Sequence, residues 1–585
     1  MVSIEELLRR VQQAETETDR QWILLEMQMS QMPEALVSML WASAIPHFFD
    51  AEVLAALRPE LKESAADLYA DLQALTFVET FSGKGYNIHE LTREVLLKQL
   101  WAQDRAEFLA LSQRAADYFF EVGASLEKKV EFCYHEVLNE KDAQKGRLLD
   151  QVVNWWTYNQ LDYIRSTLQG FMEHDSKGRL DAFGRGFLLY LRGVLEIRSA
   201  NYKEAGALFT HAQCAYSLVE IKNSRYTSTL LRDLSNSKRG CGDYKSAIHN
   251  CEQSLRISEE RLGERHPDTA TSLDNLASLY QIMGQYEKAE PLHLRALSVR
   301  EEQLGENHLS TADSLNNLAS LYQIMGQYEK AEPLHLRALS ICEEQLGENH
   351  PHTASSLNNL AMLYKAMGQY EKAGPLHLRA LSICEEQLGE NHPRTASSLN
   401  NLASFYQVMG QYEEAEPLYL RALSICEEQL GERHHHTASS LNNLASLYKA
   451  MGQYEKAEPL YLRALSICGE QLGENHPHTE ASLSNLVDLY KAMGRDQETI
   501  SMLERWQQVQ RDRRTTQNNL FVMRTAALGR LYEKRQDLSK AVSAYEEALS
   551  FCERLFGLRD QRTMILSGDL KRLKKRMSKK PKRRT

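Results

Sequence analysis

The sequence has no long apolar segment. No run of about 18 apolar residues occurs among its 585 residues, so we expect no transmembrane helix. The first residues, MVSIEELLRRVQQAE, carry neither an apolar core nor a cleavage site, so we expect no secretory signal. We therefore predict a cytoplasmic protein that has no contact with a membrane.

Cysteine pairs of the metal-binding or redox type are also missing. Nine cysteines occur, but none forms a CxxC pair. Four of them, Cys342, Cys384, Cys426 and Cys468, recur at a spacing of 42 residues. Stacked helical units lie about 10 Å apart, which is too far for a disulfide or for shared metal ligands. We predict small cysteines on helix faces in a reducing compartment, and no metal site.

The sequence also lacks a phosphate-binding loop. The Gly-Lys step in SGKGYN, at residues 82–87, does not fit the GxxxxGK[ST] pattern, because Gly85 follows Lys84 where that pattern needs Ser or Thr. We predict a turn between two strands here and no nucleotide or other cofactor. No nucleophile, base and orienting group stand out as a set. We therefore predict that the protein is not an enzyme.

What the sequence has instead is a repeat of 42 residues. The segment GQYEKAEPLHLRALSICEEQLGENHPHTASSLNNLA recurs almost unchanged, and the tyrosine of its GQY step marks the phase. These tyrosines, or the residues in phase with them, are Tyr202, Tyr244, Tyr286, Tyr328, Tyr370, Tyr412, Tyr454, Asp496 and Leu538. A period of this size predicts stacked units that bury their apolar stripes against their neighbours, and hence an elongated solenoid.

Each unit reads as two helices. Apolar residues at helical spacing, beginning at Leu273, predict a first helix, and Gly284 then predicts a turn with positive φ. A second helix follows and should end at Gly305. Pro291 lies inside this second helix, where it should cost a hydrogen bond. We expect Thr269 to cap the first helix.

These residues resemble a known family. The arrangement LA..Y...G.Y..A......A resembles the tetratricopeptide repeat, and the LGENHP loop and LNNLA segment are similar to the 42-residue kinesin-light-chain subclass. The resemblance is strong over 226–494 and weaker over 185–225 and 515–556, with a further divergent unit at 145–175. It implies an all-α, right-handed superhelix. It also implies a concave groove, lined by the first helices, that binds a protein or peptide.

The first 130 residues are not repetitive. Two helices are predicted in 32–57, a third in 63–75, and then strand, turn, strand and helix in 76–100. This order resembles a winged helix, and the step His89-Glu90-Leu91 is similar to the winged-helix module of signal-transducing (NB-ARC/STAND) NTPases. In that family the histidine touches nucleotide phosphate held by an NTPase domain, which we do not find in this sequence. The third helix is acidic, which opposes docking on DNA, so we favour a protein-interaction or regulatory role.

The charge is unevenly spread along the chain. Ten of the 69 Lys and Arg lie in the last fifteen residues, KRLKKRMSKKPKRRT, while all 79 Asp and Glu lie before them. This segment is either a solvated end or a contact for nucleic acid or another polyanion. We predict five segments: 1–130 helical and winged-helix-like (core 33–100), 131–225 divergent repeats, 226–494 near-identical repeats, 495–570 degenerate repeats and a capping helix, and 571–585 the basic tail.

Histidines recur in the loop between units. They are His308, His350, His392, His434 and His476, and the fourth begins a triplet with His435 and His436. A catalytic group would be special to one unit, whereas these are repeated, so we predict that they shape or cap the loop. Adventitious metal binding at the triplet is the alternative.

Asparagine pairs in the first helix are the best candidates for function. Asparagine is a poor helix former, so its repetition in mid-helix needs a reason. Either these amides bond to an adjacent helix, or they line the groove and pair with the backbone of a bound peptide. The candidate groove residues are Asn275, Asn316, Asn317, Asn358, Asn359, Asn400, Asn401, Asn442, Asn443, Asn485, Gln323, Lys365, Gln407 and Lys449. Further positions on the same face are Ser278, Gln281, Ser320, Ser404 and Lys491.

The sequence supports two functional hypotheses. The first is a non-enzymatic scaffold or adaptor that binds an extended protein segment in the groove. The alternative is a regulatory protein whose winged helix or basic tail contacts nucleic acid while the repeats sense a partner.

Overall fold

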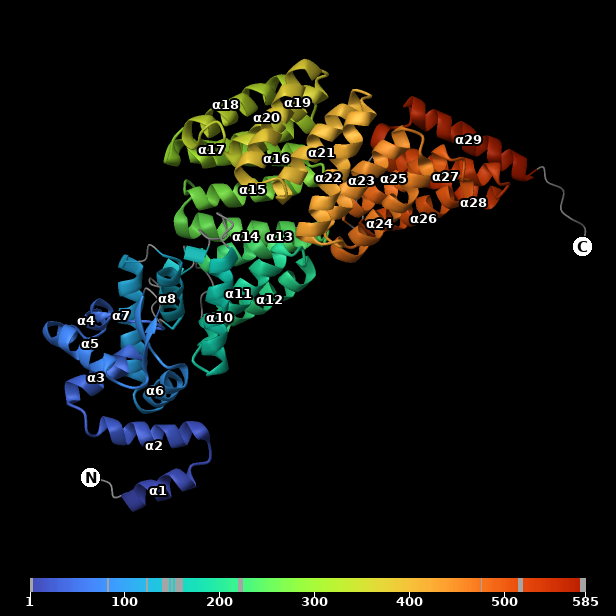
Figure 1. Ribbon diagram of the computed structural model, residues 1–585. Coiled ribbons are helices and arrows are strands. Elements are labelled where there is room, and N and C mark those ends of the chain that lie inside the picture. The colour runs from blue at the N-terminus through green and yellow to red at the C-terminus, as the bar shows by residue number, and fades with distance from the viewer. Residues whose placement is uncertain are drawn as a thin grey trace, which may run out of the picture. The chain divides into compact units, whose positions relative to one another are not determined.

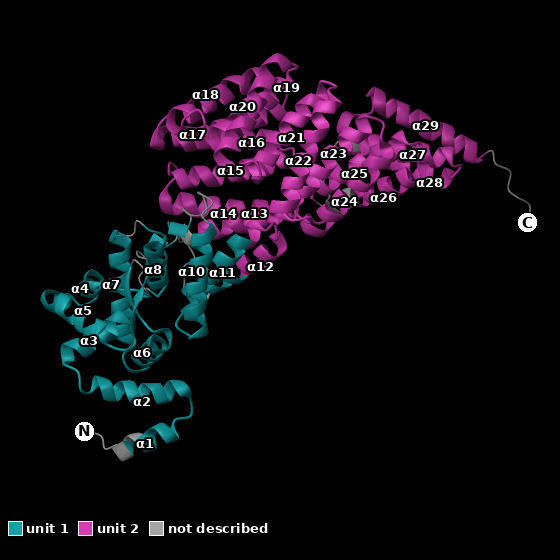
Figure 2. Ribbon diagram, in the orientation of Figure 1, with its two compact units in different colours: residues 1–195, 211–222 teal, residues 196–210, 223–585 magenta. Residues whose placement is uncertain are grey.

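The computed structural model describes residues 4–81, 84–122, 125–138, 147–148, 151–152, 161–218, 225–474, 476–513 and 519–578. The chain divides into two compact units (Figure 2). Unit 1 comprises residues 1–195 and 211–222, and unit 2 comprises residues 196–210 and 223–585. The predicted divergent repeat at 145–175 and the end of the basic tail lie partly outside the described residues. In the part of the chain that is described, no helix is long and apolar enough to cross a membrane.

Unit 1 has the predicted order of elements at its N-terminal end. Five helices and a short 3-10 helix precede a two-stranded antiparallel hairpin, in which Val78 pairs with Ile88, and the last three of these helices are the predicted ones. Phe49 adds an isolated bridge to Tyr86 at the edge of the hairpin. The elements are α1 (Ile4–Gln13), α2 (Glu17–Met29), α3 (Glu34–Ser43), α4 (Ala51–Leu57), η1 (Pro59–Ser64), α5 (Ala65–Gln73), β1 (Val78–Phe81), β2 (Gly85–Ile88), α6 (Glu90–Gln103), α7 (Arg105–Val122), α8 (Leu126–Glu136), α10 (Leu161–Ser176) and α11 (Ala182–Arg198).

The hairpin turn explains the Gly-Lys step. Gly85 has φ +102°, and a Cβ there would lie 2.4 Å from the carbonyl oxygen of Phe49, so a side chain does not fit. The Lys84 ammonium lies 2.9 Å from a carboxylate oxygen of Glu127 on α8. His89 stands exposed at the N-terminus of α6.

A buried ionic cluster ties together the helices that follow the hairpin. His47 Nδ1 lies 2.6 Å from a carboxylate oxygen of Glu131 on α8, and the Tyr134 hydroxyl donates to Glu173 on α10 at 2.9 Å. Arg93 on α6 lies 3.7 Å from the same Glu173 carboxylate. Burial favours the neutral ring, but the Glu131 carboxylate outweighs it and raises the pKa of His47 above its ordinary value. The cluster therefore connects α6, α8 and α10.

Unit 2 is a stack of antiparallel helix pairs (Figure 1). We call the first helix of each pair the A helix and the second the B helix. The pairs are preceded by α12 (Tyr202–Leu218), which spans the division between the units. They are α13 (Arg225–Gly240) with α14 (Tyr244–Leu262), α15 (Pro267–Ile282) with α16 (Tyr286–Leu304), α17 (Leu309–Ile324) with α18 (Tyr328–Leu346), α19 (Pro351–Ala366) with α20 (Tyr370–Leu388), α21 (Pro393–Val408) with α22 (Tyr412–Leu430), α23 (His435–Ala450) with α24 (Tyr454–Leu472), α25 (Pro477–Ala492) with α26 (Asp496–Arg513), and α27 (Asn519–Lys534) with α28 (Leu538–Phe556). The last helix, α29 (Gln561–Ser578), packs on α28 and contains the first part of the basic segment.

The predicted turns and helix ends are confirmed. Gly284 has φ 71° between α15 and α16, and Gly305 has φ 98° at the end of α16. Both values lie in the region that glycine adopts without strain. Pro291 does lie inside α16, on its exposed side. The carbonyl of Glu287, which loses its intrahelical partner there, also belongs to an exposed residue, so water can satisfy it.

The prediction that Thr269 caps the A helix was wrong. The N-cap residue is His266, whose Nδ1 accepts a hydrogen bond from the backbone N–H of Asp268 at 3.1 Å. The Thr269 hydroxyl instead donates to the carbonyl of Gly263. The loop histidines of the next five units cap their A helices in the same way, which confirms their predicted capping role.

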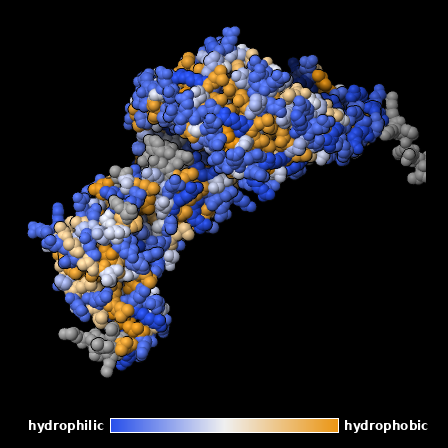
Figure 3. All heavy atoms as spheres, in the orientation of Figure 1, coloured by the Kyte–Doolittle hydropathy of each residue, from blue (hydrophilic) through white to orange (hydrophobic). Residues whose placement is uncertain are grey.

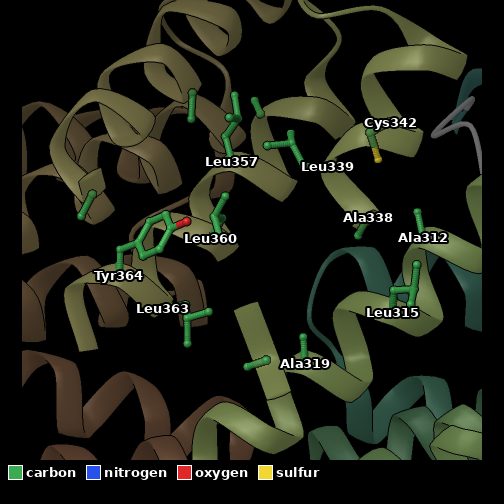
Figure 4. Close-up of a cluster of buried hydrophobic side chains, with 14 of the residues drawn as sticks. Ala312, Leu315, Ala319, Ala338, Leu339, Cys342, Leu357, Leu360, Leu363 and Tyr364 are labelled. Atoms are coloured by element: carbon green, nitrogen blue, oxygen red, sulfur yellow. The ribbon is translucent and has the colours of Figure 1, made fainter. Parts of the chain in front are cut away.

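The core runs continuously between the pairs. Figure 4 shows small and apolar side chains from α17, α18 and α19 around one interior, among them Ala319, Ala338 and Leu357. Alanine where the two helices of a pair meet lets their backbones approach closely. Successive A helices also come nearer to each other than successive B helices do. The stack therefore curves so that the A helices lie on its inner, concave side.

Candidate peptide-binding face of the repeats

The first asparagine of each pair is part of the junction between units. Asn358 Oδ1 accepts from His377 Nδ1 at 2.9 Å, and Asn358 Nδ2 donates to Ser398 Oγ of the next A helix at 3.2 Å. Asn316 makes the corresponding contacts to His335 and Ser356. The amides of Asn400 and Asn442 donate to Ser440 and Ser482. Asn316 and Asn358 therefore each bond three helices to one another, whereas Asn400 and Asn442 bond two successive A helices.

The histidines of these junctions are neutral. Burial lowers the pKa of His335 and of His377 to about 4. Each neutral ring donates through Nδ1 to the asparagine oxygen. In the units of α22 and α24 a tyrosine takes the place of this histidine, and the Tyr419 hydroxyl donates to Gln407 Oε1 at 3.0 Å.

One junction has an ionic composition. Asp274 occupies the place of the first asparagine, and Arg300 occupies the place that a cysteine takes in the following units. Arg300 Nη1 donates to Asp274 Oδ2 at 2.7 Å, and His293 Nδ1 lies 2.7 Å from Asp274 Oδ1. Ser314 of the next A helix donates to Asp274 at 2.9 Å. Asp274 connects the same three helices as Asn316 and Asn358 do in their units, but it does so through a buried ion pair.

The second asparagine of each pair is different. Asn275, Asn317, Asn359, Asn401 and Asn485 are half-buried, and their side chains have no hydrogen-bond partner among the described residues. Asn443 differs slightly, since its Nδ2 lies 3.4 Å from Asn400 Oδ1. Because the A helices stack side by side, these amides form a row on the concave side of unit 2.

Polar and apolar residues border this row near the C-terminal end of the A helices. Lys365 Nζ donates to Ser404 Oγ at 3.1 Å, and Gln407 Nε2 donates to Ser446 Oγ at 3.3 Å. Burial lowers the pKa of Lys365. Gln323 and Lys449 are half-buried, and Lys491 is exposed.

Apolar side chains follow the glutamines in the sequence. Ile282, Ile324 and Val408 are 46%, 55% and 53% exposed. Figure 3 shows that apolar residues interrupt a largely hydrophilic surface on the visible face of unit 2. The candidate face therefore offers free amides beside exposed aliphatic side chains and a few cations.

The structure thus separates the predicted asparagine ladder into two sets. The first asparagines bond to their neighbours, as the structural interpretation expected, while the second asparagines remain available. Sequence analysis missed this division, although a signal was present. Each first asparagine has a serine 40 residues later, and the aspartate at 274 is accompanied by an arginine at 300.

Family comparisons agree with the geometry. The family model described as Tetratricopeptide repeat matches residues 226–302, 274–333, 310–373, 353–404, 395–468 and 437–511, and a second model of that description matches 525–562. The chain belongs to the tetratricopeptide repeat family. Tetratricopeptide repeat proteins generally mediate protein–protein interactions. No curated protein matches the chain.

Several solved structures are similar to this tetratricopeptide repeat protein. BtubC (BKLC) from P. vanneervenii is 26% identical over 40% of this chain and 91% of its own, with a TM-score of 0.32. A putative kinesin light chain from Podosopora anserina, with nearly identical TPR-like repeats, is 31% identical over 35% of this chain and 97% of its own, with a TM-score of 0.30. A STAND protein with a tetratricopeptide repeat sensor from Pyrococcus horikoshii is 13% identical over 80% of this chain and 68% of its own, with a TM-score of 0.47.

The family models confirm the predicted repeat family, and the helix pairs of unit 2 confirm the all-α solenoid. They do not test the likeness of residues 33–100 to the winged helix of signal-transducing NTPases, which stays a prediction. The predicted five-segment division also stays a prediction.

Proposed function

We propose that this protein is a scaffold that binds an extended protein segment across the concave A-helix face of unit 2. The row of second asparagines carries the proposal. Five half-buried amides with unused hydrogen-bonding capacity lie in register along one face. A ligand that forms hydrogen bonds with half-buried polar groups of this kind gains affinity, because these groups have no other partner.

An asparagine amide suits recognition of backbone. It carries a donor and an acceptor, so it can pair with both the N–H and the C=O of a peptide unit whatever the side chain is. Packed helices are about 8–10 Å apart, and an extended peptide rises about 3.3 Å per residue. One amide would therefore meet the ligand about every third residue.

The rest of the face would add selectivity to this backbone contact. Ile324 and Val408 present aliphatic surface, and Lys449 presents a cation. Neither catalysis nor a cofactor is part of the proposal, because the repeated units offer the same groups several times and the Lys84 ammonium is engaged by Glu127.

We do not extend the proposal to DNA. The exposed face of α5, which would be the recognition helix of a winged helix, carries the carboxylates of Asp67 and Asp71. These acids would repel phosphate.

A peptide array tests the proposal. An array of random twelve-residue peptides is probed with the full chain, and the best binders are measured in solution. Replacing Asn317, Asn359 and Asn401 together by alanine should weaken these peptides by about fivefold to tenfold for each hydrogen bond lost. The matched control replaces Ser340, Ser382 and Ser424, exposed on the B helices, by alanine and should bind normally. Unchanged affinity in the asparagine variant, or equal loss in both variants, would contradict the proposal.

A further inference from the structure

Two segments of unit 2 that lie far apart in the sequence contact each other. Tyr202, at the start of α12, packs against the hydrophobic cluster formed by α21 to α27, and its ring centroid lies 6.0 Å from that of His435. At a neighbouring point a Cβ on Gly473 would lie 3.7 Å from the carbonyl oxygen of Cys241. The edge of α12 and α13 therefore lies against the loops that precede α23 and α25 (Figure 1). We call this contact the clasp.

Burial of the capping histidines marks the area that the clasp covers. His434 and His476 are 8% and 9% exposed. The equivalent His308 is exposed, while His350 and His392 are half-buried. All five make the same local hydrogen bond to their own helix, and His350 and His476 begin the same local sequence, HPHT, so the local structure does not explain why His476 is the more buried. The edge of α12 and α13 does, because it lies over these two loops.

The repeat sequence departs from its pattern at the clasp. His435 stands where α19, α21 and α25 begin with proline, and it is this ring that faces Tyr202. On the other side, Gly240 stands where the next six A helices carry isoleucine, valine or alanine. A Cβ on Gly240 would lie 2.3 Å from the ring of Tyr202, so this glycine makes room for the ring.

We propose that the clasp closes one turn of the superhelix at neutral pH, that protonation of its histidine cluster opens it, and that opening regulates access to the A-helix face. The cluster consists of His434, His435, His436, His476 and His478. The rings of His435 and His436 are 4.2 Å apart, and those of His476 and His478 are 5.2 Å apart. The consequence for access rests on the proposed function, whereas closure and its pH response do not.

The groups that surround the cluster are mostly cationic. On the α12 and α13 side, Lys203, Lys238 and Arg239 lie near Tyr202 and Cys241, together with Asp243. On the other side, Arg433 pairs with Glu470, and Arg198 faces Arg394 across the same turn. Protonated imidazoles would therefore add positive charge to an already positive contact, which opposes closure.

The direction of the pH effect follows from burial. Burial lowers the pKa of His435 to about 3 and that of His434 to about 4 in the closed state. An open, hydrated histidine titrates near 6.5. Closure is therefore fully favoured above about pH 6.5 and weakens as the pH falls below it. At pH 5.5 a single imidazole of this kind disfavours closure by about tenfold.

Hydrogen exchange of the full chain tests the clasp without any ligand. Exchange of amides 434–440 is compared with that of the equivalent amides 308–314 and 350–356, after correction for the intrinsic rate at each pH. At pH 7.5 we expect about tenfold greater protection of 434–440, and we expect that excess to disappear at pH 5.5. The same protection in all three segments at pH 7.5 would overturn the closure, and an excess that survives at pH 5.5 would overturn the histidine switch.

Two variants within the clasp and one control variant outside it complete the test. Tyr202→Ala should remove the excess protection at both pH values. His435→Pro, which restores the residue found at Pro351 and Pro393, should fold normally and leave a smaller excess with a weaker pH dependence, because the other histidines of the cluster remain. Pro351→His places an imidazole in the equivalent position outside the clasp and should gain neither protection nor pH response. An unchanged exchange pattern in Tyr202→Ala, or a pH response gained by Pro351→His, would contradict the proposal. If the clasp behaves as described but the chain binds no peptide, the result would count against the proposed function and not against the clasp.

Discussion

Two junctions of the same stack show how one geometry is made from different chemistry. Between α15 and α17 a buried Asp274–Arg300 ion pair connects the helices, while between α19 and α21 the neutral Asn358 makes equivalent connections beside Cys384. The positions are the same, and both members of the pair differ together. The comparison shows that the polar residues of each junction must match one another, because a buried charge or amide without its partner is costly.

The largest effect should come from breaking the ionic set at one member. Asp274→Asn leaves the guanidinium of Arg300, 7% exposed, without its carboxylate. A buried charge that loses its partner costs about 3–5 kcal/mol. We expect local unfolding of α15 to α18, measured as faster hydrogen exchange in these helices and as an early step in urea unfolding.

The double variant Asp274→Asn with Arg300→Cys sharpens the comparison. It converts the ionic junction into the composition of the neighbouring units, so most of the lost stability should return. Stability that stays as low as in the single variant would mean that the junctions are not interchangeable.

A smaller effect should separate the two asparagines of a pair. Asn358→Ala removes the partners of Ser398 and His377 and should cost about 1–3 kcal/mol, since it leaves buried polar groups unpaired. Asn359→Ala removes an amide that bonds to nothing in the described structure and should change stability by less than about 0.5 kcal/mol. Urea unfolding of the two variants measures both values. Equal costs would mean that the second asparagine also has a structural role.

A third comparison concerns a unit that departs from the pattern at two packed positions. Gly374 stands where its neighbours have glutamate, and Phe405 stands where they have leucine. A Cβ on Gly374 would lie 3.1 Å from the ring of Phe405. Gly374→Glu should therefore overpack this contact at a cost of about 1–2 kcal/mol, measured by thermal unfolding.

The compensating change tests whether these two positions form a set. Adding Phe405→Leu to Gly374→Glu makes room for the glutamate and gives Tyr406 the carboxylate partner that Tyr364 has in Glu332. Stability should return to at least the starting value. A double variant as unstable as the single one would show that the two departures are independent.

Much of the repeat architecture could be predicted from the sequence. The period, the Gly284 turn and the Gly305 helix end follow from local backbone chemistry, and each is confirmed. The cap was predicted at Thr269 but lies at His266, because an imidazole was not considered as a capping acceptor. The division of the asparagine ladder depends on which side of the A helix meets the next unit, and helical spacing places neighbouring residues on different faces without saying which face is covered.

The clasp could not be predicted in the same way. His435 is visible as a departure from the repeat, but its contact with Tyr202 depends on the pitch of the stack, which accumulates from small rotations at every junction. No local sequence pattern predicts the rotation accumulated over many junctions. The substitutions at Gly240 and His435 become meaningful only when the structure brings them to one place.

The last expected effect is a pH response of the neutral junctions. Burial holds the pKa of His377 at about 4, whereas an unfolded histidine titrates near 6.5. The folded state therefore loses stability as the pH falls from 6.5 towards 4, by about 1.4 kcal/mol at pH 5.5. Hydrogen exchange of α19 and α20 at pH 7.5 and pH 5.5, corrected for intrinsic rates, measures this loss.

His377→Tyr provides the matched variant for this response. The chain already has a tyrosine in this place beside an asparagine and a lysine, in the unit of Asn442, Lys449 and Tyr461, so the variant copies an existing junction. Because tyrosine does not titrate between pH 4 and 7, the variant should lose the local pH response of α19 and α20 while its other junctions keep theirs. A response that persists in the variant would place its origin in another group, and the neutral junction would then be insensitive to pH in this range.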